Sequence, residues 1–385
     1  MTPRRPDVVT VLVDLPQFEA PALMGTLRCQ SSRAGDILSF AYDDGWIKRP
    51  TAFTFDPDLA LVTGPQYTGA DRTNFGIFLD SSPDRWGRVL MQNADSGQFI
   101  DCDDQFAAPP ITSLRDLQAA SLQFEIHADD EEHPDYQRWL AQLFAPGTSL
   151  GGARPKASVS DEDGALCLAK FPSRQDRRDV GAWELVAHRL AAKAGINVPP
   201  TRALRVPESA YTTFLAKRFD RTRDNRRLAF VSAMTLTQRR DGEPGASYLE
   251  LIDLLQSRGA NTREDSRELF RRVVFSILIH NTDDHLRNHG FFIGERGIIL
   301  SPAFDLNPSI ERHELSLAIN ELDSACDVSI ALEAHREYGM SKAEAEEIVA
   351  RTTRVVAEWR HEAGRLRIPK GERELMAPAF ETAAP

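Results

Sequence analysis

The pattern of apolar and polar positions predicts a strand-rich beginning to the chain. Short apolar runs predict strands at 8–15 and 37–42, and the turn residues Asp43-Asp44-Gly45 follow the second run. The pattern then changes to one typical of a helix at 84–91. The acidic stretch 127–136, HADDEEHPDY, is interpreted as a solvated linker.

A second group of elements begins near residue 149. The glycine-containing turn SLGGARPKA leads to a predicted strand at 166–171. Apolar residues at helical spacing from 183 to 190 predict a helix, and Gly195 is a natural end for it. A further strand is expected at 211–219.

Beyond about residue 230 the pattern is mainly helical. Apolar pairs recur every four residues within 266–280, which indicates a helix with a broad buried face. Ser341 and Glu344 have the spacing of a capping box ahead of a long helix to about Gly364. We therefore expect an α+β, two-lobed fold with a β-rich N-terminal part and an all-helical C-terminal lobe. The expected units are 1–135, a β-rich N-terminal subdomain; 136–230, the core of the N-lobe; and 231–385, a helical C-lobe.

Length and composition narrow the class of protein. A chain of 385 residues exceeds the size of most single cores, so more than one packed unit is expected. No apolar run approaches the length of a membrane span, and the start of the chain is interpreted as a strand rather than a signal peptide. The net charge of −11, without a basic tail, disfavours direct binding to nucleic acid. The four cysteines are far apart, which favours a reducing cytoplasm: Cys29, Cys102, Cys167 and Cys326.

The segment HNTDDHLRNHG, residues 280–290, contains the densest group of polar side chains. Because buried polar groups need partners, a ligand site is expected here. Asp283 and Asn288 have the Asp-x4-Asn spacing of a protein-kinase catalytic loop, in which the Asp orients the substrate hydroxyl and the Asn holds Mg²⁺. Asp305 follows a strand-like run and is the expected second metal ligand. Carboxylate and amide oxygens suit this hard cation.

The β-rich half offers the groups that would bind ATP phosphates. Lys170 ends a predicted strand, and Glu184 on the following helix could hold its ammonium, as in kinases. The turn upstream could cradle phosphates through its backbone N–H groups and two cationic side chains. Its candidate residues are Gly151, Gly152, Ala153, Arg154 and Lys156. The order of these parts along the chain favours a kinase that uses Mg-ATP, so we expect the two-lobed fold to be kinase-like and 136–230 to be its ATP-binding core.

With these motifs in view, the chain resembles the HipA family, the kinase toxins of bacterial toxin–antitoxin pairs. The resemblance covers most of the chain and rests on motifs that occur in family order: FLDSSPDRWGRVLM, SLGGARPKA, LAKRFDR, NTDDHLRNHGFF, FDLNPS and ELSLAIN. It implies a Mg-ATP-dependent serine/threonine kinase with Asp283 as catalytic base and with Asn288 and Asp305 as metal ligands.

The resemblance implies further roles. Lys217 and Phe219 lie in the hinge beside the adenine, and Ser149 matches the serine that family members autophosphorylate. The implied substrate class is an aminoacyl-tRNA synthetase. The implied partner is a helix-turn-helix antitoxin, through which alone the protein would reach DNA. His285 is counted with the cofactor-binding residues, where its ring is expected to bond backbone carbonyls and brace the loop.

Two other functions fit parts of the sequence. A metal-dependent phosphohydrolase could use the His/Asp cluster at 280–289, in which His285 and His289 are spaced like two ligands on one helical face. A non-catalytic kinase-like scaffold could instead bind a DNA-binding partner, and the basic stretch 217–227 could touch nucleic acid. Such a scaffold has no need of the five residues expected in the phosphoryl-transfer site, which are Lys170, Glu184, Asp283, Asn288 and Asp305.

Overall fold

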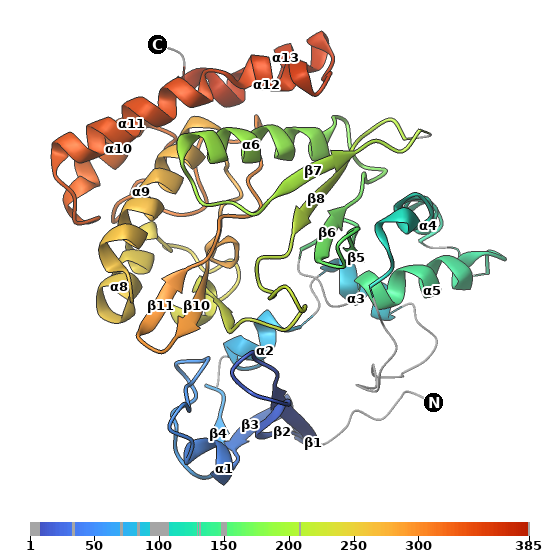
Figure 1. Ribbon diagram of the computed structural model, residues 1–385, viewed down its shortest axis with the longest axis vertical. Coiled ribbons are helices and arrows are strands. Elements are labelled where there is room, and N and C mark those ends of the chain that lie inside the picture. The colour runs from blue at the N-terminus through green and yellow to red at the C-terminus, as the bar shows by residue number, and fades with distance from the viewer. Residues whose placement is uncertain are drawn as a thin grey trace.

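A computed structural model gives the fold of most of the chain (Figure 1). It describes residues 8–32, 35–69, 72–82, 85–92, 108–128, 130, 132–147, 152–207 and 209–383. Three separate sheets and a helical C-terminal part make up the described structure. None of its helices is both long and apolar enough to cross a membrane.

The N-terminal sheet lies apart from the other two (Figure 1) and has the order β1-β2-β3-β4. Its strands are β1 (Val8–Val13), β2 (Ala22–Ser32), β3 (Gly35–Tyr42) and β4 (Gln66–Tyr67). Phe40 and Trp46 are fully buried in the core of this unit. The predicted turn at Asp43 begins the short helix α1 (Asp44–Ile47), because the Asp43 carboxylate accepts a hydrogen bond from Gly45 N at 2.8 Å. Helix α2 (Gly76–Asp80) then leads out of the unit.

The second sheet is antiparallel with the order β5-β6-β8-β7. Its strands are β5 (Lys156–Ser160), β6 (Leu166–Lys170), β7 (Thr201–Leu204) and β8 (Thr213–Lys217). The helices beside it are α3 (Arg85–Gln92), η1 (Ile111–Ser113), α4 (Leu114–Ile126), α5 (Tyr136–Gly147) and α6 (Val180–Ala194). The start of α4 buries Leu114 and Leu117 against one face of the sheet, and α6 contacts β7 and β8. Asp179 caps the start of α6. Gly195 ends the helix with φ +89°, and this end is the one that the sequence predicts.

The largest core joins α6 to the C-terminal half. The helices of that half are α7 (Ala233–Leu236), α8 (Tyr248–Arg258), α9 (Thr262–Leu278), η2 (Leu286–Asn288), α10 (Val328–Glu333), η3 (Ala334–Arg336), α11 (Lys342–Val356), α12 (Trp359–Arg365), α13 (Lys370–Met376) and η4 (Ala377–Ala383). A small sheet of order β11-β10-β9 lies among them, so this half is not built of helices alone. Its strands are β9 (Phe230–Ser232), β10 (Gly290–Gly294) and β11 (Gly297–Leu300).

The mixed α+β class predicted from the sequence is confirmed, with differences in detail. Helix α9 buries the apolar face that its four-residue repeat predicts, and the Ser341–Glu344 capping box is present. The single long helix predicted to about Gly364 is wrong, because α11 ends at Val356 and α12 begins at Trp359. The acidic stretch lies between α4 and α5, two helices that we did not predict.

Candidate active site

Lys170 lies at the centre of the polar cluster that joins the second sheet to the C-terminal half. Its Nζ is 2.6 Å from Glu184 Oε1 and 2.6 Å from Asp305 Oδ1, and the side chain is buried. The ammonium also lies 5.7 Å from the centre of the Phe214 ring. The predicted strand lysine, helix glutamate and strand-end aspartate therefore form one connected group.

The charges in this group perturb one another. Burial alone would lower the pKa of Lys170, but the carboxylates of Asp305 and Glu184 outweigh it and raise that pKa. Burial acts on Asp305 in the opposite sense, yet the nearby Lys170 holds the pKa of Asp305 well below its usual range. The pKa of Glu184 is raised, because burial outweighs the effect of Lys170. Asp305 is thus the carboxylate kept ionised, as a metal ligand must be.

Backbone strain marks both segments that carry the expected metal ligands. Asp305 has φ +59° and His280 has φ +47°, conformations that residues other than glycine rarely adopt. Asn307 N donates to Asn281 Oδ1 at 3.2 Å, which joins the two segments, and within the Asp305 segment Asn307 Nδ2 donates to Asp305 Oδ1 at 2.9 Å. The Asp305 segment is therefore fixed against the start of the predicted catalytic loop.

The neighbours Asp283 and Asp284 have opposite surroundings in that loop. Asp283 is exposed, and its backbone carbonyl accepts a hydrogen bond from Asn288 Nδ2 at 3.1 Å. The buried Asp284 accepts hydrogen bonds from Tyr248 Oη at 2.6 Å and Ser276 Oγ at 3.1 Å. Burial would raise the pKa of Asp284, but His289, whose Nε2 lies 3.0 Å away, and these hydroxyls lower it. Asp283 is accessible to a substrate hydroxyl, whereas Asp284 braces the loop from inside.

The glycine-containing turn is described only from Gly152 onward, so the predicted Ser149 and Gly151 lie outside the described residues. Gly152 has φ +89°, and any Cβ there would collide with the ammonium of Lys156. Lys156 pairs with Lys170 across β5 and β6, and its charge also lowers the pKa of Asp305. Two lysines of the sheet thus direct positive charge towards the same site.

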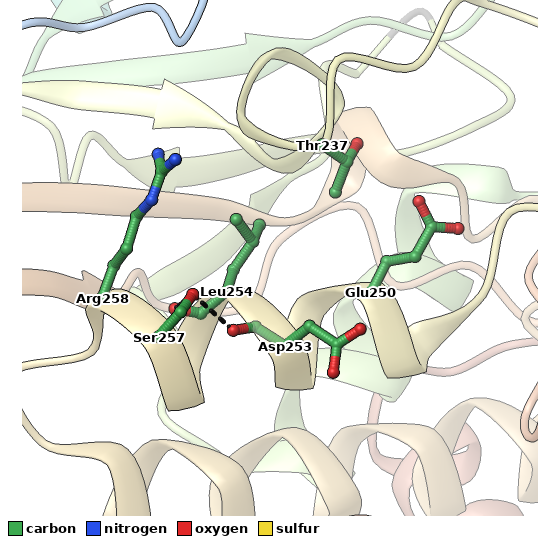
Figure 2. A pocket seen from close by; sticks show the side chains of 6 residues that line it. All are labelled: Thr237, Glu250, Asp253, Leu254, Ser257 and Arg258. Atoms are coloured by element: carbon green, nitrogen blue, oxygen red, sulfur yellow. Dashed lines mark hydrogen bonds between the residues drawn. The ribbon is translucent and has the colours of Figure 1, made fainter.

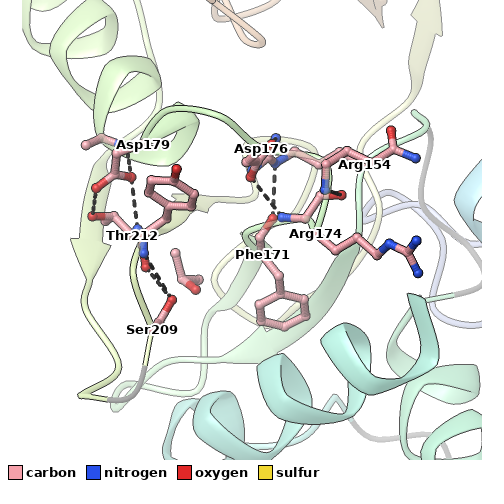
Figure 3. A network of polar contacts seen from close by, with 12 residues as sticks. Arg154, Phe171, Arg174, Asp176, Asp179, Ser209 and Thr212 are labelled. Carbon is pink, nitrogen blue, oxygen red and sulfur yellow. Dashed lines mark hydrogen bonds and ion pairs between the residues drawn. The ribbon is translucent and has the colours of Figure 1, made fainter. Parts of the chain in front are cut away.

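The guanidinium of Arg154 bonds Asp176 and the backbone of Phe171 rather than the Lys170 cluster. Its Nη1 donates to Asp176 Oδ1 at 2.8 Å, Nη2 pairs with the other carboxylate oxygen, and Nε donates to Phe171 O at 3.1 Å (Figure 3). This fork braces the turn against the segment after β6. Ala153, beside it, is exposed. Arg154 thus has a structural contact, and the phosphate contact expected of it stays a prediction.

The two hinge residues lie in different surroundings. Lys217 pairs with Cys167, and strand alternation puts its side chain on the face opposite Lys170. There it lines a cavity of about 290 Å³ with Cys167. Phe219 instead lies with its ring centre 5.4 Å from that of Phe304, the residue before Asp305. Phe219 is thus the hinge residue placed beside the expected site.

The cluster at 280–289 does not form the metal site that a phosphohydrolase would need. In the described part of the chain no three His, Cys, Asp or Glu side chains are placed together to hold a metal ion. His289 faces the buried Asp284, and His285 Nδ1 has no hydrogen-bond partner among the described residues, so the expected brace by the His285 ring stays a prediction. A Mg²⁺ ion fits better, because it takes one or two protein oxygens together with phosphates and waters. Asp305 and Asn288 supply such oxygens.

Figure 2 shows a second hollow on the surface, lined by side chains of α8 and by Thr237. It has a volume of about 220 Å³ and lies against α8, where Glu250, Asp253 and Arg258 line it. No residue predicted for phosphoryl transfer lines it. Tyr248, Asn281 and Asn307 were not predicted from the sequence. The two asparagines lie within the motifs HNTDDHLRNHG and FDLNPS, whereas Tyr248 lies in neither.

Comparison with known proteins agrees with this geometry. The family model described as HipA-like C-terminal domain matches residues 148–359, more than half of the chain. The chain belongs to this family. The matched region contains the whole of the Lys170–Glu184–Asp305 cluster and the predicted catalytic loop.

Individual relatives are more distant. The structure of HipA from Shewanella oneidensis MR-1, in a toxin–antitoxin complex with HipB and operator DNA, aligns with a TM-score of 0.63 and 15% identity, over 94% of this chain and 93% of that one. This likeness shows a shared fold. The Sinorhizobium fredii protein named "Putative kinase Y4mE" is 25% identical over 194 residues, so the match spans less than half of that relative, 44% of each chain. The Helicobacter pylori proinflammatory kinase CtkA gives a TM-score of 0.42 at 14% identity, over 61% of this chain and 93% of that one.

Proposed function

We propose that this protein is a Mg-ATP-dependent serine/threonine protein kinase and the toxin of a toxin–antitoxin pair. The observation that carries the proposal is the placement of one buried ammonium, Lys170, between Glu184 and Asp305. Phosphoryl transfer needs alignment and positive charge more than covalent help from the protein, and this cluster is built to supply both.

Each residue has a role in the proposed reaction. Lys170 and Lys156 bind the ATP phosphates, and Glu184 holds the Lys170 ammonium in place. Asn288 and Asp305 hold Mg²⁺, which when bound adds positive charge beside the transferring phosphoryl group. Asp283 orients the substrate hydroxyl and accepts its proton, for which its exposed position is suitable.

Family membership supports the substrate and partner that we propose. We propose a protein substrate of the translation machinery, such as an aminoacyl-tRNA synthetase, with autophosphorylation at Ser149 in the glycine-containing turn. A helix-turn-helix antitoxin is the proposed partner, as the HipA–HipB–operator complex of the Shewanella relative suggests. The net charge of −11 supports contact with DNA only through that partner, and we propose a cytoplasmic location.

A phosphoproteomic comparison of cells that express the wild type or Asp283→Asn tests the proposal. We expect serine and threonine phosphosites that depend on Asp283, including Ser149 and at least one site on a translation component. Identical phosphosites in both cultures would overturn the kinase assignment. Phosphate at other sites of this chain, with none at Ser149, would overturn the proposed autophosphorylation.

A further inference from the structure

The motif FLDSSPDRWGRVLM has no part in the proposed phosphoryl transfer, yet it contacts both lobes. Asp80 contacts the C-terminal half, and Trp86 contacts the glycine-containing turn. Asp80 ends α2, and its carboxylate accepts three hydrogen bonds from the C-terminal half. Ser232 N donates to Oδ2 at 2.9 Å, Ser232 Oγ to Oδ1 at 2.7 Å, and Thr235 Oγ1 to Oδ2 at 2.9 Å. Close packing supports the anchor, since a Cβ at Gly76 of α2 would lie 2.7 Å from Thr235 Oγ1.

The Asp80 anchor is next to the end of the predicted catalytic loop. Ser232 pairs with Gly290, and Ala233 N donates to His289 O at 2.8 Å. His289 and Gly290 directly follow Asn288, the proposed metal ligand. A displacement of Asp80 would therefore reach Asn288 through a short path of backbone hydrogen bonds.

Trp86 forms the second anchor, on the glycine-containing turn. Its indole Nε1 donates to Lys156 O at 3.0 Å, and its backbone N–H donates to Gly152 O at 3.4 Å. These two acceptors lie at either end of the described part of the turn, whose Lys156 is a proposed phosphate ligand. The indole is 4% exposed and packs edge-on against Phe124, so its position is fixed by the core formed by α3, α4 and α5.

We propose that Asp80 and Trp86 are the two anchors of a tether that limits how far the phosphate-binding turn can move from the catalytic loop, and that both act as positioning residues. The inference rests on the proposed kinase function. Six residue steps span at most about 20 Å, so the lobes cannot separate further unless one anchor is released. Helix α3, which carries Trp86, lies beside β5 (Figure 1).

Hydrogen exchange measured on the intact chain tests the tether without any need for activity. We expect Asp80→Ala to speed exchange of the amides at 152–160 in the far lobe as well as those near Ser232. The matched control is Asp43→Ala, which removes a carboxylate that caps α1 inside the N-terminal unit. An Asp80→Ala effect confined to α2, β9 and α7 overturns the tether, whether or not the protein proves to be a kinase.

Steady-state kinetics test its function. Trp86→Phe keeps a ring in place but removes the donor to Lys156 O, and we expect KM for ATP to rise about tenfold. Trp46→Phe is the control, because the Trp46 indole N–H is buried without a hydrogen-bond partner in the described structure. In the double variant Asp80→Ala/Trp86→Phe, the loss in kcat/KM should be smaller than the product of the two single losses, since either change releases the same tether. Multiplicative losses, or an unchanged KM in Trp86→Phe, overturn it. A wild type that transfers no phosphate contradicts the proposed function instead, and hydrogen exchange still decides on the tether.

Discussion

Lys170 Nζ lies 2.6 Å from Asp305 Oδ1, although 135 positions separate the two residues along the chain. The same ammonium lies 2.6 Å from Glu184 Oε1 on α6. A strand, a helix and the segment after β11 thus meet at one buried charge, and that meeting point joins the two halves of the molecule.

Removal of this ammonium should destabilise the fold. Lys170→Met leaves the buried Glu184 without its cation, and we expect the free energy of unfolding to fall by about 3 kcal/mol. The double variant Lys170→Met/Glu184→Leu should recover part of that loss, because only the carboxylate of Asp305, which is more exposed than that of Glu184, then lacks its cation, while phosphoryl transfer stays absent from both. Urea denaturation measures the first effect. A Lys170→Met protein as stable as the wild type would show that the ion pair of Lys170 and Glu184 does not stabilise the fold.

The two adjacent aspartates should respond oppositely to substitution. Asp283→Asn should change the free energy of unfolding by less than about 0.5 kcal/mol, because the side chain is exposed, yet it should abolish transfer. Asp284→Ala should cost about 2 kcal/mol, because Tyr248 and Ser276 lose their shared acceptor. Thermal unfolding and a transfer assay on both variants decide the matter. A reversed pattern would make Asp284 the catalytic residue.

His188, one turn of α6 beyond Glu184, predicts a pH dependence of stability. Burial, with a contribution from Lys170, lowers the pKa of this imidazole to about 3. The unfolded chain therefore binds the extra proton first, and stability present above about pH 6.5 is lost as the pH falls, by about 1.4 kcal/mol per unit. We expect His188→Leu to lack this loss, so the wild type should lose about 2 kcal/mol more than the variant between pH 6.5 and 5. If the wild type and His188→Leu lost stability in parallel as the pH falls, the result would contradict a neutral, buried His188 imidazole.

Ligand binding should separate the roles of the metal and the nucleotide. At a Mg-ATP concentration of 100 Kd, we expect the free energy of unfolding to rise by about 2.7 kcal/mol. ATP with a chelator should stabilise the protein less, and in Asp305→Asn the addition of Mg²⁺ should no longer increase the effect. Unfolding scans of this variant should therefore show the same stabilisation by ATP with and without Mg²⁺. A full Mg²⁺ increment in Asp305→Asn would exclude Asp305 as a metal ligand.

Sequence spacing predicted the members of this site better than their surroundings. Lys170, Glu184 and Asp305 were recognisable because each lies in or shortly after an element with a clear pattern. The spacing to Asn288 distinguishes Asp283 from the adjacent Asp284, but the burial of Asp284 depends on distant Tyr248 and could not be predicted from the sequence.

Other contacts had no local signal. Arg154 looks like a phosphate ligand in the sequence, but its partner Asp176 lies 22 positions away in a segment without a motif. The three-residue strand β9 is too short for a periodic pattern, so its pairing with β10 beside the catalytic loop was not expected, although the run before Asp305 is strand-like. The Asp80 and Trp86 contacts likewise depend on how whole units pack.

Transfer of label from Mg-ATP tests the central claim most directly. Purified wild type and Asp283→Asn are incubated with an extract and with ATP labelled either at the γ-phosphate or at the α-phosphate. The account predicts γ-label on serine or threonine with the wild type, none with Asp283→Asn, and no α-label with either. Equal γ-labelling by Asp283→Asn, or a wild type that transfers no label, would contradict it.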